Sequence, residues 1–319
     1  MTPIIEVKNL KKYFSTPYGM LHAVDDVSLS IQAGKTMGVV GESGCGKSTL
    51  GKTIIKLHDS TGGQILLNGE DITNVKGKAL RSVRENIQII FQDPYSSLDP
   101  RKTIEDTVRE PLIVSKRYKR AEIDNLTAEI MDLVGLDNRL RKAYPHELDG
   151  GRRQRVGIAR ALALNPKFIV CDEPVSALDV SIQAQVLNLL KELQQKKGLA
   201  YMFVTHNLSV VRHISDDICV MYLGQVVELS SSKDLFKNQL HPYTKALISA
   251  IPSTDIHNLN KREILRGEIT SPINPKPGCR FAARCKYVSD ECSQPQKLEE
   301  ICPNHYVACC KAKEINKDS

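Results

Sequence analysis

Tryptophan is absent from this 319-residue sequence, and aromatic residues make up only 5% of it. A nucleic-acid surface that stacks bases on aromatic rings is therefore not indicated. The sequence also contains no run of 18 or more apolar residues, so we expect no segment to span a membrane by itself. The first residues lack the apolar core and small-residue cleavage site of a signal peptide, which predicts a cytoplasmic protein.

Excess charge of one sign is also small. The 44 Lys and Arg residues exceed the 37 Asp and Glu residues by seven, which gives the formal net charge of +7. This excess is too weak to indicate nucleic acid as a partner, and it fits a solvated surface near anionic lipid or an acidic partner. Hydrophobic residues make up 41% of the chain and charged residues 25%, which excludes a disordered chain. The length predicts about two domains.

The nine cysteines are unevenly distributed. Three are scattered, and the other six lie near the end of the sequence: Cys279, Cys285, Cys292, Cys302, Cys309 and Cys310. In a cytoplasmic protein such a cluster indicates metal binding more than disulfide bonds.

Apolar stretches of strand length alternate with helical patterns along most of the chain. We expect strands at 27–31, 36–40, 65–67, 87–91, 168–171, 201–205, 218–221 and 226–229, and helices at 47–57, 78–84, 152–164 and 182–197. Strands that alternate with helices predict βαβ units and a largely parallel sheet.

Two regions depart from this alternation. Residues 93–150 predict a mostly helical insertion, because five apolar residues share one helical face: Ile123, Leu126, Ile130, Leu133 and Val134. Residues 253–278 are rich in proline and show no clear periodicity, which predicts a linker before the Cys-rich tail.

The motif G-x-x-x-x-G-K-S occupies residues 41–48, between an expected strand and an expected helix. Its glycines let backbone N–H groups surround phosphate oxygens, and the helix N-terminus adds positive potential. Lys47 would reach the β- and γ-phosphates, and Ser48 would bind Mg²⁺. The position of this phosphate loop predicts a nucleoside triphosphate site rather than a chance glycine-rich turn.

Two carboxylates, Asp172 and Glu173, follow the buried strand 168–171. Buried carboxylates are costly unless a cation or a proton compensates them. Asp172 suits a Mg²⁺ site, and Glu173 suits a general base that polarises an attacking water. The strand alone is a weak signal, and the phosphate loop in the same chain strengthens it.

Other candidates have a structural interpretation when each is taken alone. Gly150 and Gly151 open a helix whose N–H groups could bind an anion, but Asp149 is also typical of an ordinary helix N-cap. Asp179 likewise precedes a helix. Gln92 and His206 each follow a strand, where a solvated amide and a structural histidine are common.

Together these motifs resemble the ABC-type ATPases. The phosphate loop, Gln92, the signature segment 148–155, strand 168–173, the loop 176–179 and His206 occur in the order and spacing of that family. Segments 91–100, 174–185 and 241–252 are similar to the ATP-binding subunits of bacterial oligopeptide, dipeptide and nickel importers. The resemblance covers nearly the whole chain.

This resemblance implies an α/β fold. Residues 1–240 would form an ABC ATPase cassette with a mostly parallel sheet, an antiparallel β subdomain and a helical subdomain at about 95–155. Residues 241–319 would form a C-terminal extension that ends in the Cys-rich tail.

The resemblance also implies ATP and Mg²⁺ as ligands. Phe14, with Tyr13 as the alternative, would stack on adenine, and Lys47, Glu173 and His206 would act in hydrolysis. Mg²⁺ would be held by Ser48, Gln92 and Asp172. The full set of implied nucleotide contacts is Phe14, Gly41, Glu42, Ser43, Gly44, Cys45, Gly46, Lys47, Ser48, Thr49, Gln92, Asp149, Gly150, Gly151 and Asp179.

Members of this family work in pairs beside a membrane. Two cassettes would close head to tail, so that each ATP lies between one phosphate loop and the other chain's signature, with Asp179 bridging the pair. The implied partners are two membrane permease subunits, a second ATPase (a paralogue or a second copy) and an extracytoplasmic substrate-binding protein. The location would be peripheral, on the cytoplasmic face of the membrane.

The signature departs from the family pattern at two positions. Asp149 stands where serine is usual, and Arg152 stands where glutamine is usual. An ionised carboxylate cannot donate to a γ-phosphate, so we expect the two sites of the working dimer to be unequal unless Arg152 offsets the charge. Cys45, beside Lys47 at the helix start, is expected to favour the thiolate and to be blocked by alkylation, with ATP protecting it.

Four cysteines of the tail, Cys279, Cys285, Cys292 and Cys309, resemble the C-terminal pattern of the same importers. A [4Fe–4S] cluster is implied in some members, Zn²⁺ would also suit four thiolates, and free thiols are a third interpretation.

Peptide cargo is favoured by the resemblance, and nickel or another small solute stays open. A soluble ABC ATPase of DNA repair or translation is the alternative class. It is disfavoured because no long coiled-coil insertion and only one set of motifs are present.

Overall fold

The computed structural model describes residues 2–93, 95–251, 265, 267 and 270–317. Its main sheet has eight strands in the order β11-β12-β10-β9-β3-β8-β7-β6. The five strands from β9 to β6 pair in parallel, which confirms the predicted α/β core. The bounds are β3 Thr36–Val40, β6 Ile87–Ile90, β7 Phe168–Asp172, β8 Ala200–Val204, β9 Asp217–Tyr222, β10 Gln225–Ser231, β11 Glu299–Cys302 and β12 His305–Val307.

A second, antiparallel sheet has the order β2-β1-β4-β5. Its strands are β1 Ile5–Thr16, β2 Gly19–Ile31, β4 Gly62–Leu67 and β5 Glu70–Asp71. Helix α1 (Lys47–Ile54) packs with both sheets, because Leu50 and Ile54 share one buried cluster with Ile5 and Val39. The long strand β1 was not predicted from the sequence, because the exposed Lys8 and Asn9 interrupt the alternation of its buried apolar residues and most of its second half is only half-buried.

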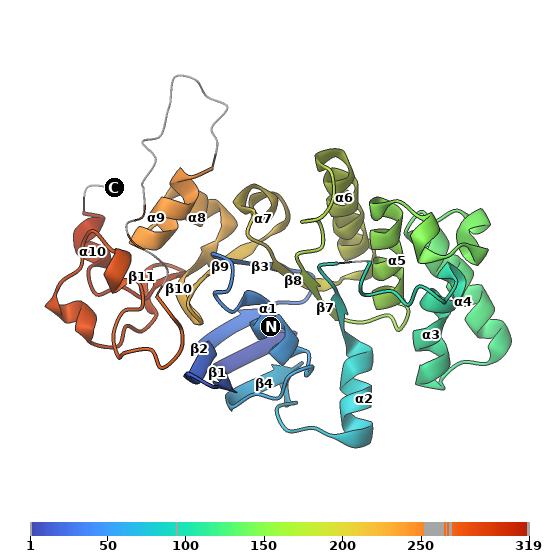
Figure 1. Ribbon diagram of the computed structural model, residues 1–319, viewed down its shortest axis with the longest axis horizontal. Helices are drawn as coiled ribbons and strands as arrows, with labels where there is room; N and C mark the ends of the chain where they lie inside the picture. Colours follow the sequence, from blue (N-terminus) through green and yellow to red (C-terminus); the bar gives the residue numbers. More distant parts are fainter. Residues whose placement is uncertain (1, 94, 252–264, 266, 268–269, 318–319) are drawn as a thin grey trace.

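The predicted helical insertion is confirmed. Helices α3 (Ile104–Ser115) and α4 (Arg120–Leu133) pack with α5 (Gly150–Leu162) and α6 (Val180–Lys197) around a common apolar core. Ile123, Ile130 and Val134 are buried in that core, as the helical pattern predicted. These helices lie at one end of the molecule, as Figure 1 shows, and α6, α7 (Leu208–Ile214) and α8 (Ser232–Lys237) lie on the side of the main sheet away from the antiparallel sheet.

The C-terminal extension lies at the opposite end (Figure 1). It contains α9 (Pro242–Ser249), α10 (Ala312–Ile315) and the two strands β11 and β12. Strand β12 pairs with β10, so the tail adds two strands to the main sheet, which the sequence analysis did not predict. Strands of three and four residues are too short to give a clear alternating pattern. Most of the linker predicted at 253–278 lies outside the described residues.

Several predicted helix bounds shift by a few residues. Helix α1 ends at Ile54 rather than at residue 57, because Lys56 adopts a left-handed backbone conformation. Helix α2 (Gly77–Asn86) extends the basic helix predicted at 78–84. Within the described part of the chain, the structure has no helix that is long and apolar enough to cross a membrane.

Candidate functional site

A cleft of about 530 Å³ lies at the edge of the main sheet where its parallel strands end. This edge is the usual ligand position in open α/β sheets. The predicted residues that line the cleft are Phe14, Ser43, Gly44, Gly46, Lys47, Ser48, Thr49, Gln92, Glu173 and His206. The structure therefore brings together residues that lie far apart in the sequence.

The phosphate loop connects β3 to α1. Gly46 has a φ of 102°, and a Cβ atom there would lie 2.0 Å from the carbonyl oxygen of Ala23, so only glycine fits. Lys47 Nζ donates to the carbonyl oxygens of Gly41 and Glu42, at 2.8 and 2.9 Å. The lysine is thereby held over the loop, beside the N-terminus of α1, where an anion is favoured.

Ser48, which lines the cleft, is in direct contact with the buried Asp172. The Ser48 hydroxyl donates to Asp172 Oδ1 across 2.6 Å, and Lys52 Nζ lies 3.6 Å from Asp172 Oδ2. A hydroxyl and a carboxylate at this separation are oxygen donors of the kind Mg²⁺ prefers, so the two side chains fit the predicted metal.

Glu173 receives contacts from two other strand ends. Gln92 Nε2 donates to Glu173 Oε2 at 3.0 Å, and His206 Nδ1 lies 3.1 Å from Glu173 Oε1. The three residues follow β6, β7 and β8, which are neighbours in the sheet, so their side chains meet at one edge. Glu173 has a φ of 47°, a strained conformation that clusters at functional sites.

The antiparallel sheet forms the side of the cleft where the adenine ring is expected. Phe14 lines the cleft, whereas Tyr13 hydrogen-bonds to Asp25 and stacks on His22 with ring centroids 3.9 Å apart. Phe14, rather than its alternative Tyr13, therefore faces a ligand in the cleft, while the Phe14 ring also packs edge-on against His58.

Five lining residues were missed by the sequence analysis: Leu21, His22, Ala23, Gly224 and Pro272. Pro272 belongs to the C-terminal extension, and its carbonyl oxygen accepts from His22 N–H at 3.0 Å. The neighbouring Ile273 forms a bridge to Leu21, and Asn274 N–H donates to the carbonyl oxygen of Met20 at 2.9 Å. No local sequence signal marks this pairing, because it joins segments about 250 positions apart.

Comparison with known proteins identifies the family. Residues 24–176 match the ABC transporter family, and residues 227–292 match the oligopeptide/dipeptide transporter C-terminal region. The chain is 50% identical over 317 residues to the oligopeptide transport ATP-binding protein AppF of Bacillus subtilis (strain 168), covering 96% of each protein. This chain belongs to the ATP-binding proteins of ABC transporters. It is also 49% identical over 309 residues to the oligopeptide transport ATP-binding protein OppF of Salmonella typhimurium, covering 96% of this chain and 92% of that protein.

Solved structures of ABC cassettes have the same fold as this ATP-binding protein. One is cbiO1 from Clostridium perfringens, part of the ABC transporter complex cbiONQ, with a TM-score of 0.68, 27% identity and coverage of 75% of this chain and 92% of that chain. Another is described as the dimeric structure of MJ0796, a bacterial ABC transporter cassette, with a TM-score of 0.65, 30% identity and coverage of 72% and 98%. The protein is thus an ATPase of the ABC type.

The signature residues of this ABC protein lie outside the cleft of their own chain. Asp149 is exposed and caps α5, because its carboxylate accepts from Arg152 N–H at 2.8 Å. Arg152 Nε also lies 3.5 Å from Asp149 Oδ2, but both side chains are more than half exposed, so this pair is weak and leaves the unusual carboxylate largely uncompensated. A Cβ atom on Gly151 would lie 2.7 Å from Ile182 Cγ2, which explains the glycine at this position. Asp179 is exposed and precedes α6, and its side chain makes no capping hydrogen bond there.

The structure contradicts the thiolate expected at Cys45, while its expected alkylation stays a prediction. Its side chain is buried, and burial raises the pKa of the thiol although Lys47 acts in the opposite direction. The motif predicted the cation beside Cys45 correctly, but not the apolar surroundings that outweigh it.

The predicted metal site of the tail is not supported. Among the residues that the structure describes, no group of three or more His, Cys, Asp or Glu side chains is placed to hold a metal ion. The thiols are nevertheless neighbours. Burial raises the pKa of Cys279, Cys285 and Cys309. Negative charge on Cys292 also acts to raise each of these pKa values.

Proposed function

We propose that this ABC ATPase powers the uptake of oligopeptides or dipeptides through a multi-subunit membrane importer. The names of the relatives in Bacillus subtilis and Salmonella typhimurium support peptide cargo, as does the transporter-type C-terminal region. The partners would be two membrane permease subunits, a second ATPase and an extracytoplasmic substrate-binding protein. The ATPase would sit peripherally on the cytoplasmic face of the membrane.

Two cassettes would form the working unit. The signature segment lies apart from its own cleft. Asp149 is exposed and Gly150 half-exposed, whereas Gly151 is buried, so the start of α5 is available to an ATP held by a partner chain. Asp179 would contact the partner at the same interface. Closure over two ATP molecules and reopening after hydrolysis would drive alternating access in the permease subunits.

The chain's own residues divide the work of hydrolysis. Lys47 would hold the β- and γ-phosphates, and Ser48 and Asp172 would hold Mg²⁺, which neutralises developing charge when it is bound. Glu173 would polarise the attacking water, and His206 would hold that water and the γ-phosphate. Gln92 would complete the site and transmit its state to the membrane partner. Catalysis is then a matter of positioning and charge stabilisation.

The observation that carries this proposal is the contact of Gln92 and His206 with Glu173 in the cleft that Lys47 and Ser48 also line. We expect Glu173→Gln to abolish ATP turnover in the assembled transporter while ATP binding persists. Turnover at the rate of the unmodified protein would contradict the assignment. Peptide uptake by cells carrying the same variant should fall in parallel. A fall in nickel uptake with unchanged peptide uptake would show that nickel, and not peptide, is the cargo.

We further propose that Cys279, Cys285, Cys292 and Cys309 hold a [4Fe–4S] cluster. The support is the residue type, because all four are cysteines, three of them partly covered and Cys292 buried, although their side chains in the described residues are not gathered around one metal position. Thiolates hold iron–sulfur clusters, and a bound group would stabilise a tail with little apolar core of its own. Anaerobically purified protein should absorb near 400 nm and contain iron, as clusters of this kind do (about four atoms per chain). Protein without iron would contradict the cluster, and zinc in its place would support the Zn²⁺ alternative.

A further inference from the structure

The phosphate loop contacts the C-terminal extension through Glu42. The Glu42 N–H donates to the hydroxyl oxygen of Tyr243 at 2.9 Å. Arg284 binds the Glu42 carboxylate with two parallel hydrogen bonds, Nη1 to Oε2 at 2.7 Å and Nη2 to Oε1 at 3.1 Å. Both partners come from the extension, about 200 and 240 residues away from the loop in the sequence. The backbone and the side chain of one loop residue are therefore both held by the extension.

Both partners from the extension are buried, while the Glu42 side chain is 25% exposed. The Arg284 side chain is only 7% exposed, and Tyr243 is fully buried. Tyr222, Tyr243 and Phe281 form an aromatic cluster with ring centroids 4.8, 5.3 and 5.5 Å apart. Bidentate Arg–carboxylate pairs in such surroundings are strong and well oriented. The charge of Glu42 is thus balanced within the fold.

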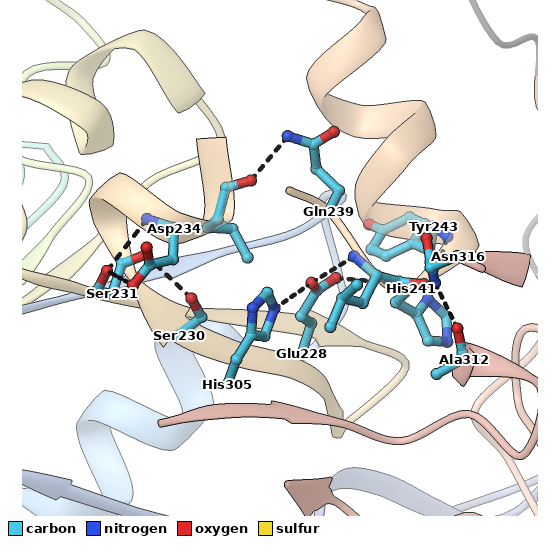
Figure 2. A network of polar contacts seen from close by, with 12 residues as sticks. Glu228, Ser230, Ser231, Asp234, Gln239, His241, Tyr243, His305, Ala312 and Asn316 are labelled. Carbon is cyan, nitrogen blue, oxygen red and sulfur yellow. Dashed lines mark hydrogen bonds and ion pairs between the residues drawn. The ribbon is translucent and has the colours of Figure 1, made fainter. Parts of the chain in front are cut away.

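Helix α9, which carries Tyr243, is itself tied to the main sheet. The buried Glu228 carboxylate of β10 accepts from the backbone N–H groups of Leu240 and His241, at 2.8 and 3.0 Å. His305 Nε2 of β12 lies 2.7 Å from the same carboxylate, and the His241 ring accepts from Tyr243 N–H at 3.1 Å (Figure 2). The position of the Tyr243 hydroxyl is consequently fixed by contacts with the main sheet.

We propose that the C-terminal extension is a working part of the nucleotide site, in which Tyr243 and Arg284 are positioning residues for the phosphate loop. Tyr243 accepts from the backbone N–H of Glu42, and the carbonyl oxygen of the same residue accepts from Lys47 Nζ at 2.9 Å. Arg284 neutralises the Glu42 carboxylate, which would otherwise repel a triphosphate in the neighbouring cleft. The inference rests on the proposed function, because it takes ATP as the ligand of that cleft.

The charge part of the inference is tested by removing Arg284. We expect Arg284→Gln to weaken ATP binding by the full-length protein about tenfold at low salt, because Glu42 is left unpaired. ADP should be affected less than ATP, and adenosine, which carries no charge, should be unaffected. Adding Glu42→Gln to this variant should restore ATP affinity to within about twofold of the unmodified protein, since no charge is then left to repel the phosphates.

A purely structural role of Arg284 gives a different result. Loss of folding would weaken the binding of ATP, ADP and adenosine alike, and Glu42→Gln would not restore it. That outcome overturns the charge argument. Should Arg284→Gln fail to fold, Arg284→Lys keeps the charge but loses the bidentate geometry. We expect Arg284→Lys to bind ATP two- to fivefold more weakly, because one ammonium does not orient the Glu42 carboxylate as the guanidinium does. Unchanged affinity would overturn the assignment of Arg284 as a positioning residue.

The backbone part is tested by Tyr243→Phe, which removes the acceptor of the Glu42 N–H. Tyr201→Phe is the matched control, because Tyr201 is also fully buried and donates its hydroxyl to the carbonyl oxygen of Leu190 at 3.1 Å, far along the chain from the loop. We expect Tyr243→Phe alone to weaken ATP binding, by about three- to tenfold, while both variants lose similar stability. Equal ATP affinity in the two variants would overturn the inference.

Lys47→Ala separates this inference from the proposed function. If Lys47→Ala abolishes ATP binding but the Arg284 and Tyr243 variants bind normally, only the role of the extension is wrong. If Lys47→Ala binds ATP normally, the cleft is not the ATP site and the proposed function itself fails.

Discussion

The hydroxyl of Ser48 donates a 2.6 Å hydrogen bond to Asp172, which joins the first turn of α1 to the end of β7. The two residues are 124 positions apart, and they meet because β3 and β7 both pair with β8 in the parallel sheet. We expect Asp172→Asn to lower the affinity for Mg²⁺ more strongly than the affinity for nucleotide without metal. The measurement is ATP binding titrated against Mg²⁺. Ser48→Ala should shift the same titration in the same direction, and an unchanged Mg²⁺ dependence in both variants would refute the assignment.

The carboxylate of Asp149 predicts unequal sites in the working dimer. Asp149→Ser supplies a hydroxyl that can donate to a γ-phosphate and still caps α5, since serine and aspartate are comparable caps. We therefore expect a higher ATPase rate in the assembled transporter with little change in the stability of the subunit. Asp149→Ala is the control, because it should cost about 1 kcal/mol of stability by removing the cap. An ATPase rate that does not change with Asp149→Ser would count against the hypothesis.

The buried His241 makes the stability depend on pH. Burial lowers the pKa of His241 to about 4, against an ordinary value of 6.5, although the Glu228 carboxylate acts in the opposite direction. Between these pH values the unfolded chain binds more protons than the folded chain, so the free energy of unfolding falls as the pH falls from about 6.5 to about 4. The contribution of this one group is about 1 kcal/mol per pH unit across that range.

The histidine substitution that tests this is His241→Asn, which keeps a side-chain acceptor for Tyr243 N–H but does not titrate. Its unfolding free energy, followed by urea denaturation, should depend less on pH in this range than that of the unmodified protein. His213→Asn, at an exposed histidine of α7, serves as the control and should leave the pH dependence unchanged. An identical dependence of the unfolding free energy on pH in His241→Asn and the unmodified protein would show that folding does not lower the pKa of His241.

Cys45 should be protected from alkylation in the folded protein, even without ATP. Its thiol is buried and its pKa is raised, so little reactive thiolate is available. The exposed Cys302 should react with a maleimide at least about tenfold faster, as measured by peptide mass spectrometry over time. Rapid labelling of Cys45 that is suppressed by ATP would contradict this prediction and support the reactive thiolate expected from the motif.

The sequence by itself determined the motifs whose chemistry is local. The phosphate loop was predicted correctly because its glycines, Lys47 and Ser48 lie within eight residues between a strand and a helix. The helical pattern of residues 123–134 likewise depends on spacing along a single element. The same holds for the cap at Asp149, which the structure places at the start of α5.

Only the tertiary structure decided which distant groups meet. The contacts of Gln92 and His206 with Glu173 depend on the order of β6, β7 and β8 in the sheet, and that order is set by packing rather than by local pattern. The contacts of Arg284 and Tyr243 with Glu42 join segments more than 200 residues apart, and burial raises the pKa of Cys45, against the thiolate that the motif predicted. Contacts and solvent exposure of this kind arise from long-range packing, which residue spacing does not encode.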